Sequence, residues 1–319
     1  MDFFGERNID LLKLRFLRYA VYSLLTELGW GAQVYIASII AFSFFSMLLI
    51  SNMIVSHYAK VSWSIKLCAV VIIILCFPFF SVFITETLLG STFLLWCVYY
   101  KISRKNKKAL FFFTLAVCTH PLFLVFAIVL IPNFAIKSSM RFWIGVISYY
   151  LLIFLFFILP QEYIYIELLS SIKRKLYNYL FSFDDDFLSL SRVFQVYLMS
   201  LIKVSLIYWV VVNIKKLDEF GEMIKPVLLL FLPISTISFI NYVFLERFVY
   251  MGGLFAIIPF SYALVRFSNK KNIIMFTGLF FLFFFPFNLY FYRQFYLTTI
   301  DALIGNFYYE LFPVEIYIQ

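Results

Sequence analysis

Long apolar runs, mostly of about twenty residues, follow one another along this chain and limit the folds open to it. That length is what a helix needs to cross the hydrocarbon core of a bilayer. We predict spans at 33–55, 64–83, 85–100, 141–159, 193–214, 226–245, 248–267 and 272–292. Charged residues make up only 13% of the chain, against about 25% in a typical soluble domain. The sequence therefore predicts an all-α polytopic membrane protein with about eight full spans, built as a single integral-membrane domain over 1–319.

The net charge of +9 is explained by membrane topology rather than by nucleic-acid binding. Cytoplasmic loops of membrane proteins carry an excess of Lys and Arg. The basic residues of this chain gather in short turns between apolar runs, at 101–108, 137–141, 215–225 and 268–272. We predict that these four turns are cytoplasmic and that the chain binds no nucleic acid.

The segment 109–135 is apolar except at Thr119-His120-Pro121. One straight crossing would put the basic turns on either side of it on opposite faces of the membrane, against the charge rule. We therefore predict a short helical hairpin over 109–135, with its tip at Thr119-His120-Pro121. Each arm, of about 11 to 15 residues, is about 17–22 Å long as a helix, short of the roughly 30 Å core. This predicts a recessed tip in a protein-lined cavity that opens to the outer side.

The rest of the chain is predicted to lie at the outer surface. Residues 1–32 have amphipathic helical spacing and form an interfacial helix that ends near Gly29-Trp30-Gly31. The long loop 160–192 and the tail 293–319 are extracytoplasmic. The beginning of the chain is too charged for a cleavable signal peptide. The four cysteines, all in apolar segments, are expected to be core residues: Cys68, Cys76, Cys97 and Cys118.

The two histidines have different surroundings. His57 lies in a short predicted cytoplasmic turn and is expected to be solvated. His120 lies at the hairpin tip, where it either satisfies backbone groups next to Pro121 or acts as a general base or phosphate contact.

Several charged residues at the outer ends of spans, and one inside a span, are candidate site residues. Arg247 lies in the outer turn before span 248–267, either as a wetted turn residue or as a bidentate phosphate ligand, and Tyr250 lies one turn on. For Arg293 we favour a role in anchoring the outer end of a span at the membrane interface over phosphate binding. Lys203 is in the middle of span 193–214, where a lone cation is functional or paired. Glu86, at the outer end of span 85–100, is a candidate base or partner.

Metal binding is not expected. The run Asp184-Asp185-Asp186 lies in the long outer loop, where consecutive carboxylates are usually solvated. The four cysteines do not have the paired spacing of a metal site. We therefore expect no metal and no cofactor.

Three short motifs follow one another along the chain: Glu86-Thr87-Leu88-Leu89-Gly90-Ser91, Ala116-Val117-Cys118-Thr119-His120 and Glu246-Arg247-Phe248-Val249-Tyr250. They resemble motifs of the Wzy-type and EpsG-like bacterial polysaccharide polymerases. That family has a motif like E-x-x-R-Q/A-S-x-A at an outer span end, then A-x-x-x-H-x-x, then R-F-x-x-Y near the C-terminus. Ala116-Val117-Cys118-Thr119-His120 matches the second and Glu246-Arg247-Phe248-Val249-Tyr250 the third. Glu86-Thr87-Leu88-Leu89-Gly90-Ser91 matches the first in part, with Leu89 where the family has arginine. The family usually has a further span before the interfacial segment, so Met1 is expected to be an internal start or the chain a shorter variant.

The resemblance implies a metal-independent membrane glycosyltransferase of the bacterial plasma (inner) membrane. Its substrate would be undecaprenyl-diphosphate-linked oligosaccharide, polymerised into O-antigen of lipopolysaccharide, capsule or exopolysaccharide. His120 or Glu86 would act as base, and Arg247, perhaps with Arg293 and Tyr250, would bind the diphosphate. Expected partners are membrane lipids, a chain-length regulator and a flippase.

The first alternative to a polymerase is a lipid-linked oligosaccharide flippase or another transporter. Such a protein would need more spans and charges inside many helices, and it commonly has internal symmetry. A membrane acyltransferase and a structural assembly subunit are further alternatives.

Overall fold

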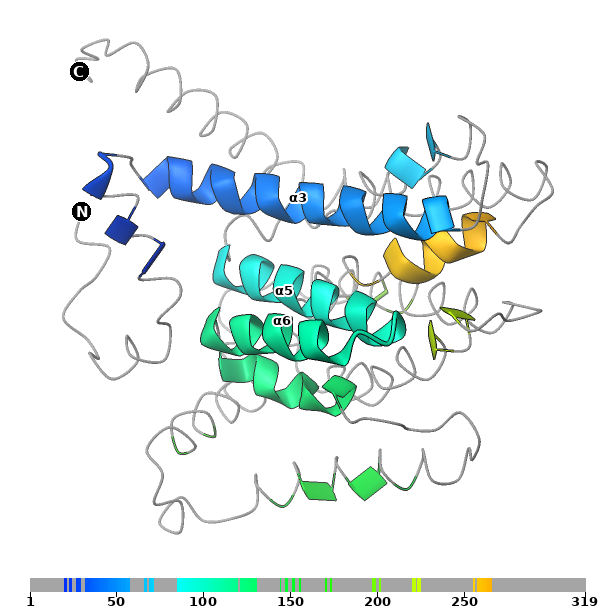
Figure 1. The fold of residues 1–319 in the computed structure, drawn as a ribbon. Coiled ribbons are helices and arrows are strands. Elements are labelled where there is room, and N and C mark those ends of the chain that lie inside the picture. The colour runs from blue at the N-terminus through cyan, green and yellow to red at the C-terminus, as the bar shows by residue number, and fades with distance from the viewer. Residues whose placement is uncertain are drawn as a thin grey trace.

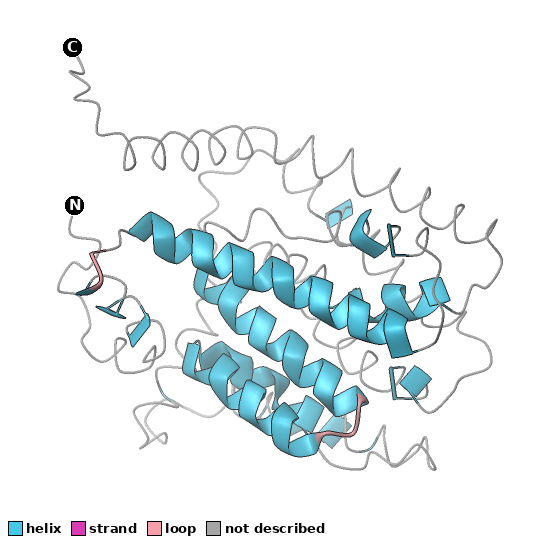
Figure 2. Ribbon diagram, turned by 45° about the horizontal axis from the view of Figure 1, so that its top comes forward, coloured by secondary structure: helices cyan, strands magenta, loops and turns pink. Residues whose placement is uncertain are grey.

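The computed structural model of this chain contains helices and turns, and no strand, in the residues that it describes (Figures 1 and 2). Those residues are 20–21, 23–24, 27–29, 32–57, 66–67, 69–71, 85–119, 121–130, 144, 147–148, 151–152, 155, 170, 173, 197–198, 201, 220–221, 223–224, 255 and 257–265. The longer elements are α3 (Ala32–His57), α5 (Thr85–Ile102), α6 (Asn106–Thr119) and the 3₁₀ helix η2 (Pro121–Leu130). The predicted all-α class is confirmed for this part of the chain.

Helix α3 is long and apolar enough to cross a membrane. It contains no Asp, Glu, Lys or Arg, and its 26 residues make it about 39 Å long at about 1.5 Å per residue. The stretch that meets the requirements of a span is Val34–His57, the one such helix in the described part of the chain. It coincides with the span predicted at 33–55.

Helix α3 has large apolar side chains that are exposed and several hydroxyl groups that are buried. Phe45 and Leu49 on its outer face are 60% and 53% exposed. The serines Ser43, Ser46 and Ser51 are buried on its inner face. A surface helix of a soluble protein turns its polar side outward, whereas helices packed in lipid place small and hydroxyl residues at their contacts. Exposed apolar side chains and buried hydroxyl groups thus both occur on α3, and Ser38, Asn52 and Ser56 are exposed as well.

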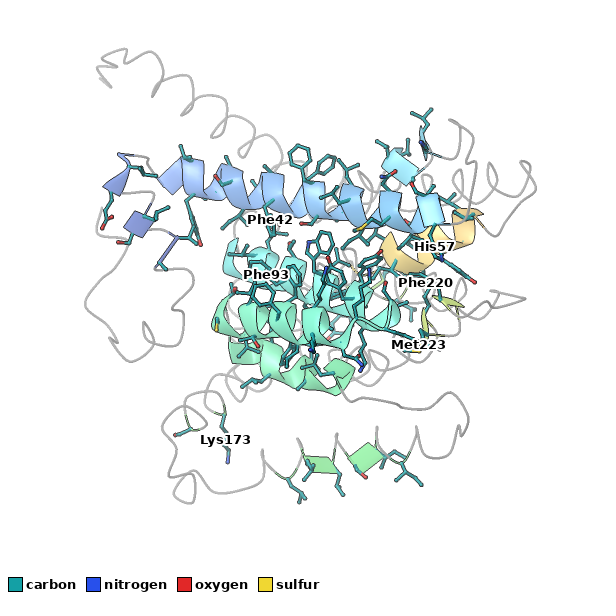
Figure 3. All side chains as sticks on the ribbon, viewed as in Figure 1. Phe42, His57, Phe93, Lys173, Phe220 and Met223 are labelled. Atoms are coloured by element: carbon teal, nitrogen blue, oxygen red, sulfur yellow. The ribbon has the colours of Figure 1, made fainter. Side chains whose placement is uncertain are left out.

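Helix α5 lies at the centre of the described bundle and packs against α3, α6 and η2. Every residue from Leu88 to Thr92 is buried, so this part of α5 is covered on all sides. The Thr92 and Ser43 hydroxyls share a hydrogen bond of 2.8 Å between α5 and α3. The rings of Phe93 and Phe42 meet beside it, with centroids 5.5 Å apart (Figure 3).

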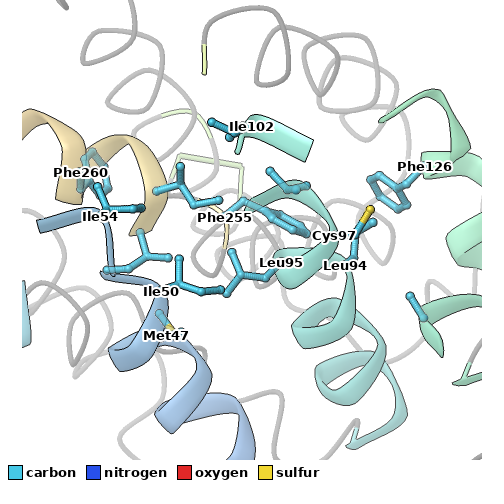
Figure 4. Close-up of a cluster of buried hydrophobic side chains, with 14 of the residues drawn as sticks. Met47, Ile50, Ile54, Leu94, Leu95, Cys97, Ile102, Phe126, Phe255 and Phe260 are labelled. Carbon is cyan, nitrogen blue, oxygen red and sulfur yellow. The ribbon is translucent and has the colours of Figure 1, made fainter. Parts of the chain in front are cut away.

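A hydrophobic core joins these helices to residues 257–265 (Figure 4). Met47, Ile50 and Ile54 from α3 meet Leu94 and Leu95 from α5. The residues from Phe260 to Leu264 are all buried, and the Ser261 and Ser51 hydroxyls are 2.8 Å apart in a hydrogen bond. Residues 257–265, part of the span predicted at 248–267, are thus helical and packed against α3.

A tight turn joins α5 to α6. The N–H of Lys105 donates to the carbonyl oxygen of Tyr100 at 2.8 Å, and the N–H of Arg104 donates to that of Lys101 at 3.0 Å. Arg104 has φ = 58°. This bond pair with a left-handed residue is the Schellman motif that ends many helices. It reverses the chain within three residues, so α6 packs antiparallel to α5.

The chain reverses a second time between α6 and η2. The 14 residues of α6 make it about 21 Å long at about 1.5 Å per residue. The 10 residues of η2 make it about 20 Å long at about 2.0 Å per residue, so the two arms are equally long. The described part of the predicted hairpin therefore returns towards the α5–α6 turn. Its second arm is a 3₁₀ helix rather than the expected α-helix. His120 and residues 131–135 lie outside the described residues.

Two shorter segments bear on other predictions. Gly29 has φ = 76° and follows helical residues, in agreement with the predicted helix end near Gly29-Trp30-Gly31. The segment 215–225 was predicted to be a loop, but its described residues, 220–221 and 223–224, are helical. Ile224 is buried in the core, and this apolar contact explains why the described residues pack against the bundle.

Candidate functional site

The predicted site residues lie almost entirely outside the described structure. Glu86 is in the first turn of α5, where its backbone is described and its side chain is not. His120 falls between the last residue of α6 and the first of η2. Arg247, Tyr250, Lys203 and Arg293 are outside the described residues, as are Asp184, Asp185 and Asp186. The described contacts therefore define only the surroundings of Glu86 and His120.

The beginning of α5 and the α6–η2 junction lie at the same end of the bundle (Figure 1). Gly90, just inside α5, faces the ring of Phe123, just inside η2. A Cβ on Gly90 would overlap this ring, at 2.9 Å from Phe123 Cδ2 and Cζ. Glycine is therefore what allows η2 to approach α5 this closely. Because of this contact, the turn of α5 that contains Glu86 lies near the residues on either side of His120.

The hydroxyl group of Ser91 is buried at the same end of α5. Ser91 is 1% exposed, and its Oγ has no hydrogen-bond partner among the described residues. Thr119, by contrast, is satisfied, because its hydroxyl donates to the carbonyl oxygen of Leu115 at 2.8 Å. A buried polar group without a partner costs folding free energy. The Ser91 hydroxyl is thus a polar group available next to the Gly90–Phe123 contact.

Lys101 marks the opposite end of α5, and its position differs from the predicted one. We expected it in an exposed cytoplasmic turn, but α5 continues to Ile102 and Lys101 is only 6% exposed. Its Nζ donates to Asn106 Oδ1 at 3.2 Å and to the carbonyl oxygen of Leu130 at 3.2 Å. These two acceptors, from α6 and η2, explain why the ammonium lies inside. Nothing in the sequence pattern indicates the Leu130 partner, which is 29 residues away.

Phe220, one of the four described residues of segment 215–225, lies at the same end of the bundle as Lys101. Its ring centroid is 6.5 Å from that of Tyr99 in α5 and 6.0 Å from that of Tyr262. His57, the last residue of α3, is exposed, and α3 ends at the same end of the bundle as α5 (Figure 1). His57, the turn 101–108 and Phe220, which all belong to segments predicted to be cytoplasmic, therefore lie at one end of the bundle. His57 is helical rather than in a turn, since α3 runs two residues beyond the predicted span.

Metal ligands do not gather in the described part of the chain. No group of three or more His, Cys, Asp or Glu side chains within it could hold an ion. Cys97 is buried and Cys118 half-buried, both as free thiols, as expected for core residues. Cys68 and Cys76 lie outside the described residues.

No protein-family model, curated protein or solved structure matches this chain. The resemblance to polysaccharide polymerases therefore depends on the three motifs. Of the first motif, all six residues from Glu86 to Ser91 are in α5, and of the second, Ala116 to Thr119 are in α6. The third motif lies outside the described residues.

Proposed function

We propose that this chain is a multi-pass protein of the bacterial inner membrane that polymerises undecaprenyl-diphosphate-linked oligosaccharide repeat units. The product would be O-antigen, capsule or exopolysaccharide at the outer face. One observation carries the proposal. The first motif begins α5 and the second ends α6, and the antiparallel packing of these helices with the Gly90–Phe123 contact brings both motif segments to one end of the bundle.

The reaction requires a base and a cation site at that end. A sugar hydroxyl of one unit attacks the anomeric carbon of another chain, and undecaprenyl diphosphate leaves with the electron pair of the broken C–O bond. His120 or Glu86 accepts the hydroxyl proton. Arg247, with Arg293 and Tyr250, stabilises the departing diphosphate, because guanidinium groups pair bidentately with phosphate oxygens. No metal is part of this proposal.

The length of α6 supports a site recessed below the outer surface. At about 21 Å it is shorter than the roughly 30 Å hydrocarbon core, so a hairpin that starts at the inner side ends inside the membrane. Polar groups at that depth require a cavity lined by protein. The outer loop 160–192 would cover the growing glycan there, and Lys203 would be a buried charge of the same domain.

Deletion of the gene in its host, followed by gel separation of the surface glycan, tests the function. A polymerase deletion leaves single repeat units on the carrier or lipid core, whereas a flippase deletion leaves none. Polymer of normal length would refute the proposal.

The site assignment is tested in the same assay with His120→Ala and Arg247→Ala. Both should abolish chain growth while the protein still inserts in the membrane. The matched control is His57→Ala, which removes the other histidine at the opposite end of the bundle and should leave polymer length unchanged. Full activity of both site variants would exclude these roles.

A further inference from the structure

The turn between α5 and α6 exposes four cations within five residues. Arg104, Lys105, Lys107 and Lys108 are all exposed, whereas Lys101 is buried against Asn106 and Leu130. The sequence from 87 to 161 contains seven Lys and Arg residues and no Asp or Glu. The turn therefore has no carboxylate near it in the sequence, and its charge is directed outward.

Arg104 occupies a backbone position that suits glycine better. Its φ of 58° lies in the left-handed region, which L-residues with a Cβ adopt at a cost. Helices that end in a Schellman motif usually have glycine here. The chain instead places a long cation at the apex of the turn, next to three lysines.

Stacked aromatic rings lie next to one of these cations. The ring centroids of Trp96, Tyr100 and Phe112 are between 5.5 and 5.7 Å apart, with interplanar angles of 21° to 26°. Lys108 Nζ lies 5.4 Å from the centroid of the Tyr100 ring, in a cation–π contact. Trp and Tyr are enriched at the level of the lipid headgroups. In a membrane, an aromatic cluster of this kind would favour a position of the turn at the level of the headgroup phosphates.

We propose that the turn 103–108, together with Tyr100, binds anionic phospholipid headgroups of the inner leaflet. Charge complementarity identifies the ligand, because clustered Lys and Arg next to a membrane helix attract anionic lipids. The separate, flexible ammonium groups suit several mobile headgroups better than one rigid ligand. The proposal does not depend on the polymerase function, and it requires only that α5 and α6 lie in a membrane.

Quenching of Trp96 by brominated lipid tests this directly. Trp96 is kept as the single tryptophan by changing Trp30, Trp63, Trp143 and Trp209 to Phe, and the protein is reconstituted in phosphatidylcholine vesicles. Brominated phosphatidylglycerol should then quench Trp96 more strongly than brominated phosphatidylcholine at the same mole fraction. Each cation near an anionic surface changes binding about fivefold, so the preference should be severalfold. It should shrink at high salt because of screening.

Two variants that lose the same amount of charge test whether the preference for phosphatidylglycerol comes from the turn. In the first, Arg104, Lys105, Lys107 and Lys108 are changed to Gln, and the two lipids should quench equally. In the control, four lysines of other predicted cytoplasmic turns are changed to Gln, and the preference should persist: Lys215, Lys216, Lys270 and Lys271. Flotation of the vesicles confirms insertion of each protein. If the fourfold variant does not insert, single Lys105→Gln and Lys107→Gln variants are used instead. Each should lose part of the preference for phosphatidylglycerol.

Three results would overturn the proposal. The first is equal quenching by both lipids in the unsubstituted single-tryptophan protein. The second is loss of the preference in the control variant to the same extent as in the turn variant. The third is loss of the preference on addition of inorganic phosphate or of an acidic peptide at constant ionic strength, which would assign the turn to a soluble ligand.

Discussion

The ammonium of Lys101 and the carbonyl oxygen of Leu130 are 3.2 Å apart, and this hydrogen bond ties the end of α5 to the end of η2. At the other end of the same two helices, Gly90 faces the Phe123 ring. The two contacts fix η2 alongside α5 in a parallel orientation. They are the reason why the chain, after leaving the Lys101 end along α6, must return to it.

Lys101→Met tests the contact with Leu130. Methionine keeps the length of the buried side chain but leaves the Leu130 carbonyl and the Asn106 amide without their donor. We expect a loss of about 1–3 kcal/mol in the free energy of unfolding, measured as a lower thermal midpoint in detergent. Lys105→Met is the matched control, since Lys105 is exposed in the adjacent turn. Equal midpoints for the two variants would mean that Lys101 does not hold η2.

Gly90→Ala tests the contact at the other end. The new methyl group meets the Phe123 ring, so either η2 or the ring must move, at a cost of about 1–3 kcal/mol. Phe123→Leu in the same chain should recover part of this loss, because it removes the overlapping ring atoms. A double-mutant cycle on thermal unfolding measures the coupling. Strictly additive effects of the two substitutions would show that Gly90 and Phe123 do not touch.

Arg104→Gly should stabilise the fold while weakening anionic-lipid binding. Glycine relieves the left-handed strain at φ = 58°, for a gain of about 0.5–1 kcal/mol in the free energy of unfolding. Arg104→Ala, which removes the same charge and keeps a Cβ, is the control and should bring no such gain. If both variants change the thermal midpoint equally, the effect comes from the charge and not from the backbone.

The sequence predicted the two longest described helices well because their signals are local. Apolar runs at 33–55 and 85–100 correspond to α3 and α5 within three residues at each end. The basic turns and the break at Thr119-His120-Pro121 predicted a reversal that α6 and η2 follow. Other features depend on contacts between distant residues. The burial of Lys101 requires the Leu130 carbonyl, and the approach of η2 requires the Gly90–Phe123 contact, and neither pairing leaves a pattern in the sequence.

We propose that the chain leaves the inner side at 101–108, exposes position 120 to the outer side and returns to the inner side at 137. Cysteine accessibility tests this topology. Cys68, Cys76, Cys97 and Cys118 are replaced, and single cysteines are introduced at Lys105, His120 and Lys137. With a membrane-impermeant thiol reagent on intact cells, we expect labelling at 120, and labelling at 105 and 137 only after permeabilisation. Labelling at 137 in intact cells, with 105 protected, would show a straight crossing and refute the hairpin.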